Sequence, residues 1–165
     1  MLLFQEKILE DRIYRQADIA AACMKKYAPQ AFQNMTKHKN PSCRIGYSKE
    51  QPFSGSTMTL DYAAHHHRDV GNMMGGATAI TTLIPNKRKK NKRETSLHVL
   101  SSYSLDGSTP GVAIDLPAGS LCLEVSREEY HGSTRVAHPW RFTPSRIAVV
   151  FYQGNLLNYK NHGRK

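Results

Sequence analysis

Short apolar runs cut by glycine and proline follow one another after Pro41, and they limit the fold more than any other feature of the chain. The runs are rich in β-branched and aromatic residues, which is typical of strands, and no helical pattern separates them. Six short strands at fairly regular spacing favour a closed or two-sheet β architecture over parallel βαβ units. The predicted strands cover residues 55–62, 77–84, 97–105, 112–116, 121–126 and 146–153.

The N-terminal forty residues follow a different pattern. Between residues 6 and 28 good helix formers alternate with apolar residues at a loose helical spacing, and Pro29 ends this pattern. We therefore predict a helical leader over residues 1–40 that packs on a β core formed by residues 41–165. A chain of 165 residues is long enough for one domain with a hydrophobic core.

The charge of the chain favours a polyanionic partner. Lysine and arginine number 23 against 13 acidic residues, which gives a formal net charge of +10. No amphipathic basic helix stands out, so nucleic acid is preferred to anionic lipid, the alternative being a basic surface that is only solvated. Residues 85–93 hold six cations. This run predicts an exposed loop that contacts phosphates, serves as a nuclear import signal, or is simply solvated.

Other features exclude several classes of protein. No segment has the roughly 18 consecutive apolar residues that a membrane span requires. The N-terminus becomes charged too early for a signal peptide. The three cysteines form no CxxC pair, which excludes a disulfide scaffold and a self-contained cysteine zinc finger. We expect a soluble intracellular protein.

The triplet His67-Arg68-Asp69 is the first candidate for chemistry, and it lies just after the first predicted strand. Alternation along a strand would place the imidazole and the carboxylate on one face. With a second, distant histidine they would form the two-histidine, one-carboxylate face that holds ferrous iron and leaves positions open for substrates. The triplet alone is a weak signal, so the rest of the chain has to supply the context.

A distant histidine and a late arginine supply that context. His131 lies far from the triplet, and Arg146 begins the last predicted strand. This order resembles the iron- and 2-oxoglutarate-dependent dioxygenases, whose double-stranded β-helix (jelly roll) agrees with the predicted strands. In that superfamily the arginine pairs with the far carboxylate of 2-oxoglutarate, a task suited to a planar guanidinium. The resemblance implies a mainly β fold with a double-stranded β-helix core behind the helical leader.

Whole segments make the resemblance narrower. They are similar, in the same order, to the ten-eleven translocation (TET) methylcytosine dioxygenases. The similarity runs from about residue 27 to residue 163 and covers the C-terminal part of that family's catalytic region. The matching segments are 27–34 (YAPQAFQN), 43–46 (CRIG), 52–55 (PFSG), 67–72 (HRDVGN), 98–100 (HVL), 111–114 (GVAI), 143–153 (TPSRIAVVFYQ) and 162–163 (HG).

This resemblance implies the residues that hold the metal and the co-substrate. His67, Asp69 and His131 would ligate iron(II) and form the catalytic centre, and His98 and Arg146 would hold 2-oxoglutarate. Without the resemblance, His98 would be interpreted as an ordinary core histidine.

The resemblance also implies how a base is held. Asn72 would form a hydrogen bond with a flipped methylcytosine, Tyr152 would stack on it, and Thr57 would support the tyrosine. These roles suit the chemistry, because a base inside a duplex can be oxidised on its methyl group only after it has been extruded into a pocket. Without the resemblance, Tyr152 is a plain strand residue.

Three further positions match ligands of structural zinc in the family: Cys43, His65 and His162. Four-coordinate zinc needs four donors. The chain lacks the cysteines that would complete each set, so the resemblance implies partial zinc sites whose other ligands lie outside this chain. A lone cysteine or histidine can also be an ordinary packing residue.

The resemblance implies a nuclear chromatin regulator that acts in DNA demethylation. It would oxidise 5-methylcytosine in double-stranded DNA to 5-hydroxymethylcytosine, and further to formyl and carboxyl forms, with 2-oxoglutarate and O₂ as co-substrates. Two alternatives stay open. One is a truncated, catalytically incompetent fragment that binds DNA, which the missing cysteine-rich segment makes credible, and the other is a related dioxygenase that acts on RNA or on other modified bases. The sequence names no protein partner and no oligomeric state.

Overall fold

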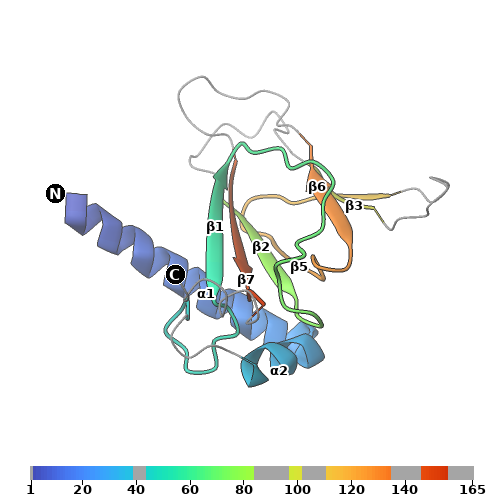
Figure 1. Cartoon of the computed structure of the whole chain (residues 1–165). Coiled ribbons are helices and arrows are strands. Elements are labelled where there is room, and N and C mark those ends of the chain that lie inside the picture. The colour runs from blue at the N-terminus through green and yellow to red at the C-terminus, as the bar shows by residue number, and fades with distance from the viewer. Residues whose placement is uncertain (1, 39–43, 84–96, 102–110, 135–145, 156–165) are drawn as a thin grey trace, which may run out of the picture.

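The computed structural model describes residues 2–38, 44–83, 97–101, 111–134 and 146–155, with the backbone alone for 2–5 and 97–101 (Figure 1). Within these residues two helices come first, α1 (Leu2–Tyr27) and α2 (Pro29–Lys37), and seven strands follow. The strands are β1 (Gly55–Leu60), β2 (Thr78–Leu83), β3 (Leu97–Ser101), β4 (Val112–Asp115), β5 (Leu121–Glu124), β6 (Tyr130–Ser133) and β7 (Ile147–Tyr152).

The strands form two antiparallel sheets. The four-stranded sheet has the order β1-β7-β2-β5, and the three-stranded sheet has the order β4-β3-β6. The last strand of the chain, β7, therefore lies between β1 and β2, with Gly55 opposite Tyr152 and Ala79 opposite Phe151. Strand β2 is buried along nearly its whole length. Its side chains alternate, so that Ala79 belongs to the hydrophobic core and Ile80 lines a cavity on the other face.

The helices cover one face of the four-stranded sheet (Figure 1). The buried residues of α1 are spaced three, four and seven positions apart, so they form one stripe along the helix. Proline at residue 29 disfavours a helical Ala28 before it, and its fixed φ suits the first position of α2. The helices therefore meet at a corner and share one core with the sheet: Ala17, Ala20, Ala21, Met24, Phe32, Met35, Phe53, Ala77, Ala79, Val149 and Phe151.

The structure confirms a mainly β fold with a helical leader. Each of the six predicted strands overlaps an observed one, with shorter bounds, and the end of the 97–105 prediction lies outside the described residues. Two elements were not predicted, the short strand β6 and the second helix of the leader. None of the described helices is long and apolar enough to span a membrane. The cation-rich run at residues 85–93 lies outside the described part of the chain.

Candidate metal centre and its cavity

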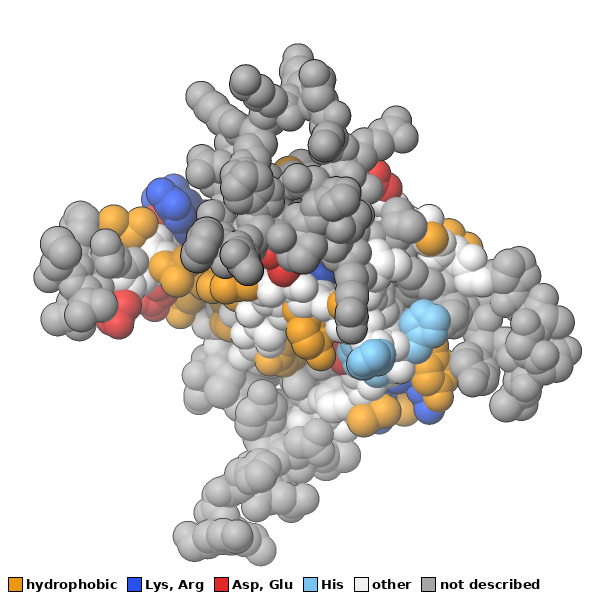
Figure 2. Space-filling view, turned by 90° about the horizontal axis from the view of Figure 1, so that it is seen from above, with side chains coloured by type: hydrophobic (Ala, Val, Ile, Leu, Met, Phe, Trp, Pro, Cys, Tyr) orange, Lys and Arg blue, Asp and Glu red, His pale blue; other side chains and the backbone are white. Residues whose placement is uncertain are grey.

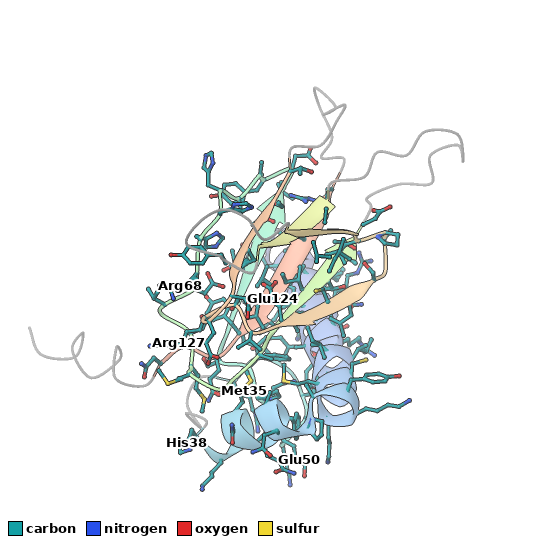
Figure 3. The ribbon with its side chains drawn as sticks, turned by 90° about the vertical axis from the view of Figure 1, so that its right-hand side faces the viewer. Met35, His38, Glu50, Arg68, Glu124 and Arg127 are labelled. Atoms are coloured by element: carbon teal, nitrogen blue, oxygen red, sulfur yellow. The ribbon has the colours of Figure 1, made fainter. Side chains whose placement is uncertain are left out.

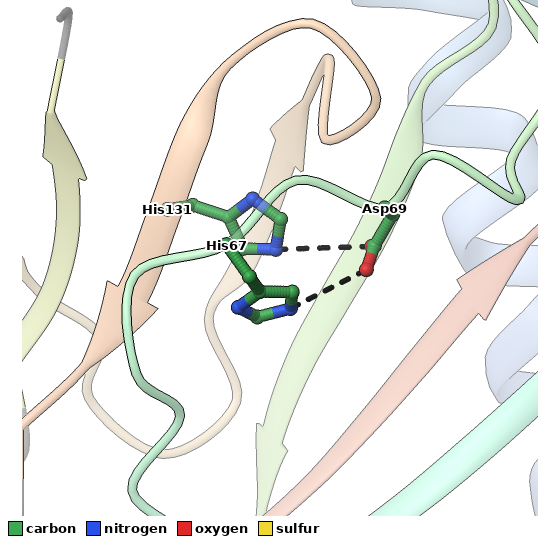
Figure 4. A group of neighbouring side chains, drawn as sticks. All are labelled: His67, Asp69 and His131. Carbon is green, nitrogen blue, oxygen red and sulfur yellow. Dashed lines mark ion pairs between the residues drawn. The ribbon is translucent and has the colours of Figure 1, made fainter.

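Three metal-ligating side chains meet at one point, although they come from distant parts of the chain. One ligand atom from each of His67, Asp69 and His131 lies within 4.8 Å of the others, and this is the one such group among the described residues. His67 Nε2 is 3.3 Å from Asp69 Oδ1, and His131 Nε2 is 3.7 Å from Asp69 Oδ2 (Figure 4). The predicted triplet and the predicted distant histidine are thus brought together.

A β-bridge between His67 and His131 joins the two segments. The backbone N–H of each histidine donates to the carbonyl of the other, both at 3.0 Å. Gly132 follows at a point with no space for a side chain, since a Cβ there would lie 2.9 Å from both the Ala64 carbonyl oxygen and His66 Cδ2. His67 and Asp69 do lie together, but the expectation that a strand aligns them is wrong, because this segment belongs to no strand and is ordered by the bridge at His67 and by a hydrogen bond from the Asp69 N–H to the Ser126 carbonyl.

Backbone carbonyls select the tautomer of both imidazoles. His67 Nδ1 lies 2.7 Å from the carbonyl oxygen of His65, and His131 Nδ1 lies 3.2 Å from the carbonyl oxygen of Glu129. A carbonyl can only accept, so the neutral ring carries its proton on Nδ1 and donates it there. In this tautomer each Nε2 carries the lone pair, which is the form that binds a metal.

The donor set fits a divalent transition metal. Two imidazole nitrogens and one carboxylate form the facial arrangement typical of non-haem iron(II). Donor atoms about 2.1 Å from an ion can be at most about 4.2 Å apart. The two separations to Asp69, 3.3 and 3.7 Å, fall within this limit, and the whole set lies within 4.8 Å, so the donors need only a small inward movement to bind one ion. The side chain of His131 is 7% exposed, that of Asp69 is 30% exposed and that of His67 is 45% exposed, so the site extends from a buried histidine to the surface.

Asn72 contacts the carboxylate ligand. Its Nδ2 donates to Asp69 Oδ2 at 3.3 Å, to Thr78 Oγ1 at 3.2 Å and to Ser126 Oγ at 3.0 Å. A carboxylate accepts and cannot donate, so the amide nitrogen must face Asp69. The amide oxygen is then the group that Asn72 can offer as an acceptor to a ligand in the cavity that it lines.

A cavity of about 510 Å³ opens beside the three ligands, within the usual size range of small-molecule sites. Residues from both sheets line it, among them β1, β5, β6 and β7. Figure 2 shows histidine side chains at the surface next to hydrophobic ones. Four other sequence-predicted site residues lie in the cavity wall together with the ligands: Thr57, Asn72, Arg146 and Tyr152.

The ring of Tyr152 lies close against β1 because residue 55 is a glycine. A Cβ at Gly55 would be 2.6 Å from Tyr152 Cε2 and 2.7 Å from Cζ, which is closer than real Cβ atoms approach. The ring is therefore held against the strand at the edge of the cavity. Thr57, two residues further along the same strand, also lines the cavity and is exposed.

Arg146 brings a positive charge to the same wall. Its backbone N–H donates to Asp61 Oδ1 at 2.6 Å, and its Nη2 donates to the carbonyl of Tyr62. Burial lowers the pKa of the guanidinium, and the charge of Asp61 partly offsets this. The group stays charged at neutral pH because arginine starts from a very high pKa. The cavity can therefore attract a carboxylate.

Glu124 is a cavity residue that the sequence analysis missed. It is the buried last residue of β5, and its Oε1 lies 3.6 Å from His131 Nε2 (Figure 3). A buried carboxylate at this place adds negative charge beside the metal ligands. The sequence feature that could have indicated Glu124 is an acidic residue at the end of an otherwise apolar strand, where the alternation of side chains directs it to a buried face.

Some predictions fall on side chains that the structure does not describe. The backbone of His98 pairs with Ile114 and Ser133 in the three-stranded sheet, but its side chain is outside the description. Cys43 and His162 also lie outside the described residues. His65 is exposed next to the β-bridge. The zinc sites and the role of His98 stay predictions.

Comparison with known proteins finds relatives of similar sequence. The chain is 35% identical over 126 residues to methylcytosine dioxygenase TET1 of Mus musculus, a match of 71% of this chain and 6% of that protein. It is 37% identical over 112 residues to methylcytosine dioxygenase TET of Drosophila melanogaster, which covers 63% of this chain and 4% of that protein. A solved structure of OsALKBH1 is similar with a TM-score of 0.48 and 14% identity, over 83% of this chain and 62% of that one. No conclusion about the fold rests on a likeness at this level.

Two histidines and an aspartate beside a cavity, in a mainly antiparallel β protein, define the class as a metal-dependent oxygenase domain. A family model described as the oxygenase domain of the 2OGFeDO superfamily, Tet_JBP, matches residues 4–155. The chain belongs to this TET/JBP family. It spans only 4–6% of the length of the two methylcytosine dioxygenases compared above.

Proposed function

We propose that this chain is an iron(II)- and 2-oxoglutarate-dependent dioxygenase that oxidises 5-methylcytosine in double-stranded DNA to 5-hydroxymethylcytosine, and further to formyl and carboxyl forms, in active DNA demethylation. The convergence of His67, Asp69 and His131 beside a cavity of about 510 Å³ carries the proposal. Membership of the 2OGFeDO superfamily supports iron and 2-oxoglutarate as the cofactors. The names of the relatives support methylcytosine as the substrate.

The residues that line the cavity have separate roles in this proposal, beginning with the metal and the co-substrate. Iron, 2-oxoglutarate and O₂ together would supply the oxidant for a C–H bond of the base methyl group. His67, Asp69 and His131 would hold the metal, with the two imidazoles already oriented by backbone carbonyls. Arg146, together with His98, binds and orients the carboxylate of 2-oxoglutarate.

Other residues of the cavity lining receive the base. Tyr152, packed on Gly55, offers its aromatic ring for stacking, and Thr57 also lines the cavity. Asn72 donates its amide hydrogens towards Asp69, which leaves its amide oxygen to accept a hydrogen bond from the exocyclic amino group of cytosine. Held in this way, the base would direct its methyl group towards the metal ligands and would exclude water from the site.

Several wider expectations belong to the same proposal. The two sheets would form a double-stranded β-helix over residues 41–165, with residues 1–40 as the leader that packs on it. Structural zinc bound through Cys43, His65 and His162 would need further ligands outside this chain. The protein would act in the nucleus, where a net charge of +10 aids binding to duplex DNA through its phosphates.

The test is mass spectrometry of a methylcytosine-containing duplex oligonucleotide after incubation with the purified chain, iron(II) and 2-oxoglutarate. We expect the base to gain one oxygen atom and succinate to be released, and His67→Ala to abolish both. His38→Ala, an exposed histidine on the C-terminal end of α2, is the matched control and should keep full activity (Figure 3). DNA binding without product would favour the incompetent fragment, and product only on RNA or another base would favour the related dioxygenase.

A further inference from the structure

Two residues just after β5, Ser126 and Arg127, hold the turn that carries the carboxylate ligand. The backbone N–H of Asp69 donates to the carbonyl of Ser126 at 2.9 Å. Arg127 Nη1 donates to the carbonyl of Val70 at 2.7 Å and to that of Asn72 at 2.5 Å. We call this pair of residues the 126–127 clamp, because it contacts the beginning, the middle and the end of the turn at residues 69–72.

The clamp also reaches the carboxylate through buried hydroxyl groups. Ser126 Oγ lies 2.5 Å from Thr78 Oγ1, and Nδ2 of Asn72 donates to both. Ser126 and Thr78 are each only 2% exposed, so water cannot replace a lost partner. The same Nδ2 of Asn72 also donates to Asp69 Oδ2 at 3.3 Å, which connects the two hydroxyl groups to the carboxylate. Loss of one buried hydroxyl would leave unsatisfied polar groups behind a metal ligand.

The segment between β5 and β6 also orients a second metal ligand, His131. After the clamp, the backbone N–H groups of Glu128 and Glu129 donate to the carbonyl of Val125 at 2.9 and 3.0 Å and close a tight turn. The carbonyl of Glu129 then faces His131 Nδ1 at 3.2 Å. A single segment between β5 and β6 therefore orients ligands from two different parts of the chain.

The turn at residues 69–72 needs such support. Gly71 lies in its middle, and glycine has more backbone freedom than any other residue. Val70 is 66% exposed, so its side chain adds little packing. The turn is anchored mainly by hydrogen bonds, and the guanidinium of Arg127, with several donors in a rigid plane, can bind two carbonyls at once.

We propose that Ser126 and Arg127 are positioning residues that hold the Asp69 carboxylate in the geometry required by the metal. This inference rests on the proposed metal centre and deepens it, since neither residue contacts the metal or the substrate. Outer contacts of this kind change metal affinity by about 10- to 100-fold when they are removed.

The test is titration of Mn(II) into the metal-free chain, with free Mn(II) measured by electron paramagnetic resonance. Arg127→Met and Ser126→Ala should each bind Mn(II) about 10- to 100-fold more weakly than the wild-type chain. Arg127→Lys keeps the charge but not the planar fork, so its affinity should fall between those of the wild type and Arg127→Met.

Arg12→Met is the matched control. Arg12 is exposed on α1, outside the 126–127 clamp and the metal centre. This variant removes the same charge as Arg127→Met and no hydrogen bond to the turn, so it should bind Mn(II) as the wild type does. Equal losses in Arg12→Met and Arg127→Met would assign the effect to charge and overturn the proposal.

Unchanged affinity in both Arg127→Met and Ser126→Ala also overturns it. If Arg127→Met does not fold, Arg127→Lys decides, and wild-type affinity in that variant overturns the proposal. A wild-type chain that binds no Mn(II) contradicts the metal centre itself, which separates the failure of the proposed function from the failure of this inference.

Discussion

At the scale of single residues, the orientation of the Asn72 amide predicts which base is preferred. Its nitrogen faces Asp69, so its oxygen is an acceptor for the cavity. Cytosine offers an amino group at that edge and thymine offers an oxygen. We expect the chain to oxidise a thymine methyl group roughly 5- to 150-fold more slowly than that of 5-methylcytosine, the equivalent of about 1–3 kcal/mol.

Initial rates on two oligonucleotides that differ only in the target base measure this preference. Asn72→Ala should bring the ratio of the two rates towards one. The ratio is the correct readout, because this variant also removes a contact to Asp69 and lowers both rates. Equal rates on both bases in the wild-type chain would contradict the assigned orientation.

The thiol of Cys122 gives a second prediction for a single residue. Burial, and then the charge of Glu124, raise its pKa to about 11. Only the thiolate reacts with iodoacetamide, so at pH 8 the native thiol should react roughly 100-fold more slowly than the same thiol in urea, where its pKa is about 8.5. Peptide mass mapping of Cys122 over time measures both rates, and equal rates would contradict the prediction.

The sign of the linked stability follows from the same shift. The folded thiol holds its proton more tightly than the unfolded one, so its contribution to stability is complete below about pH 8.5. It is lost as the pH rises towards about 11. Urea midpoints of the wild-type chain should fall over this range by more than those of Cys122→Ala.

The sequence predicted the residues whose chemistry has few substitutes. An iron(II) site of this kind needs two histidines and a carboxylate, so His67, Asp69 and His131 could be found by residue type and order. A bound co-substrate carboxylate needs a positive charge, so Arg146 could be found in the same way. The clamp could not be found in this way. Ser126 and Arg127 act through backbone carbonyls, which every residue has, so their partners leave no pattern in the sequence.

At the scale of elements, strand β6 is a feature that the folded structure determines and the residue types do not predict. Its four residues, Tyr130–Ser133, lack a β-branched run and include a glycine, so no strand was predicted there. Tertiary contacts decide its conformation, since it pairs with β3 and reaches His67 through the bridge. The longer β-branched runs were predictable because their composition alone favours strands.

Gly132 in this strand carries a testable consequence. A side chain there would meet the Ala64 carbonyl and His66 at 2.9 Å and push the two histidine segments apart. We expect Gly132→Ala to weaken Mn(II) binding at least several-fold in a titration of the metal-free chain. Glu129→Ala, nearby and exposed, should bind normally, and wild-type affinity in Gly132→Ala would contradict the tight fit.

The helical leader carries the second prediction for an element. Met24 is completely buried where α1 meets the sheet, and Met24→Ala should lower the free energy of unfolding by about 2–5 kcal/mol. Ile19 is 54% exposed on the same helix, so Ile19→Ala should change it by no more than about 0.5 kcal/mol. Urea unfolding followed by circular dichroism measures both. Separate transitions for helix and sheet would contradict a shared core.

At the scale of the whole molecule, the metal would join parts of the chain that the sequence keeps apart. Four strands, β2 to β5, separate His67 from His131 along the chain, and the β-bridge brings the two histidines together in the fold. Binding to the folded state alone should therefore stabilise the entire domain. At a concentration 100 times the dissociation constant, Mn(II) should raise the melting temperature by roughly 5–10 °C.

Removal of the metal with EDTA should reverse this shift, and His67→Ala should show none of it. Differential scanning calorimetry measures the three samples. An equal shift in His67→Ala would mean that the ion binds elsewhere. The cavity between the sheets could not be predicted from sequence in any detail, because Glu124, Ile80 and Tyr152 become neighbours only through the strand order of the folded protein.

The acceptors behind the two imidazoles are main-chain atoms of residues 65 and 129, each two positions before its histidine. Every amino acid at those positions has the same carbonyl oxygen, so substitutions of the side chains at residues 65 and 129 leave the protonated nitrogen of each imidazole unchanged. Relatives that diverge widely around this centre could thus retain its metal chemistry, and evolution could alter the rim for new substrates without rebuilding what lies beneath.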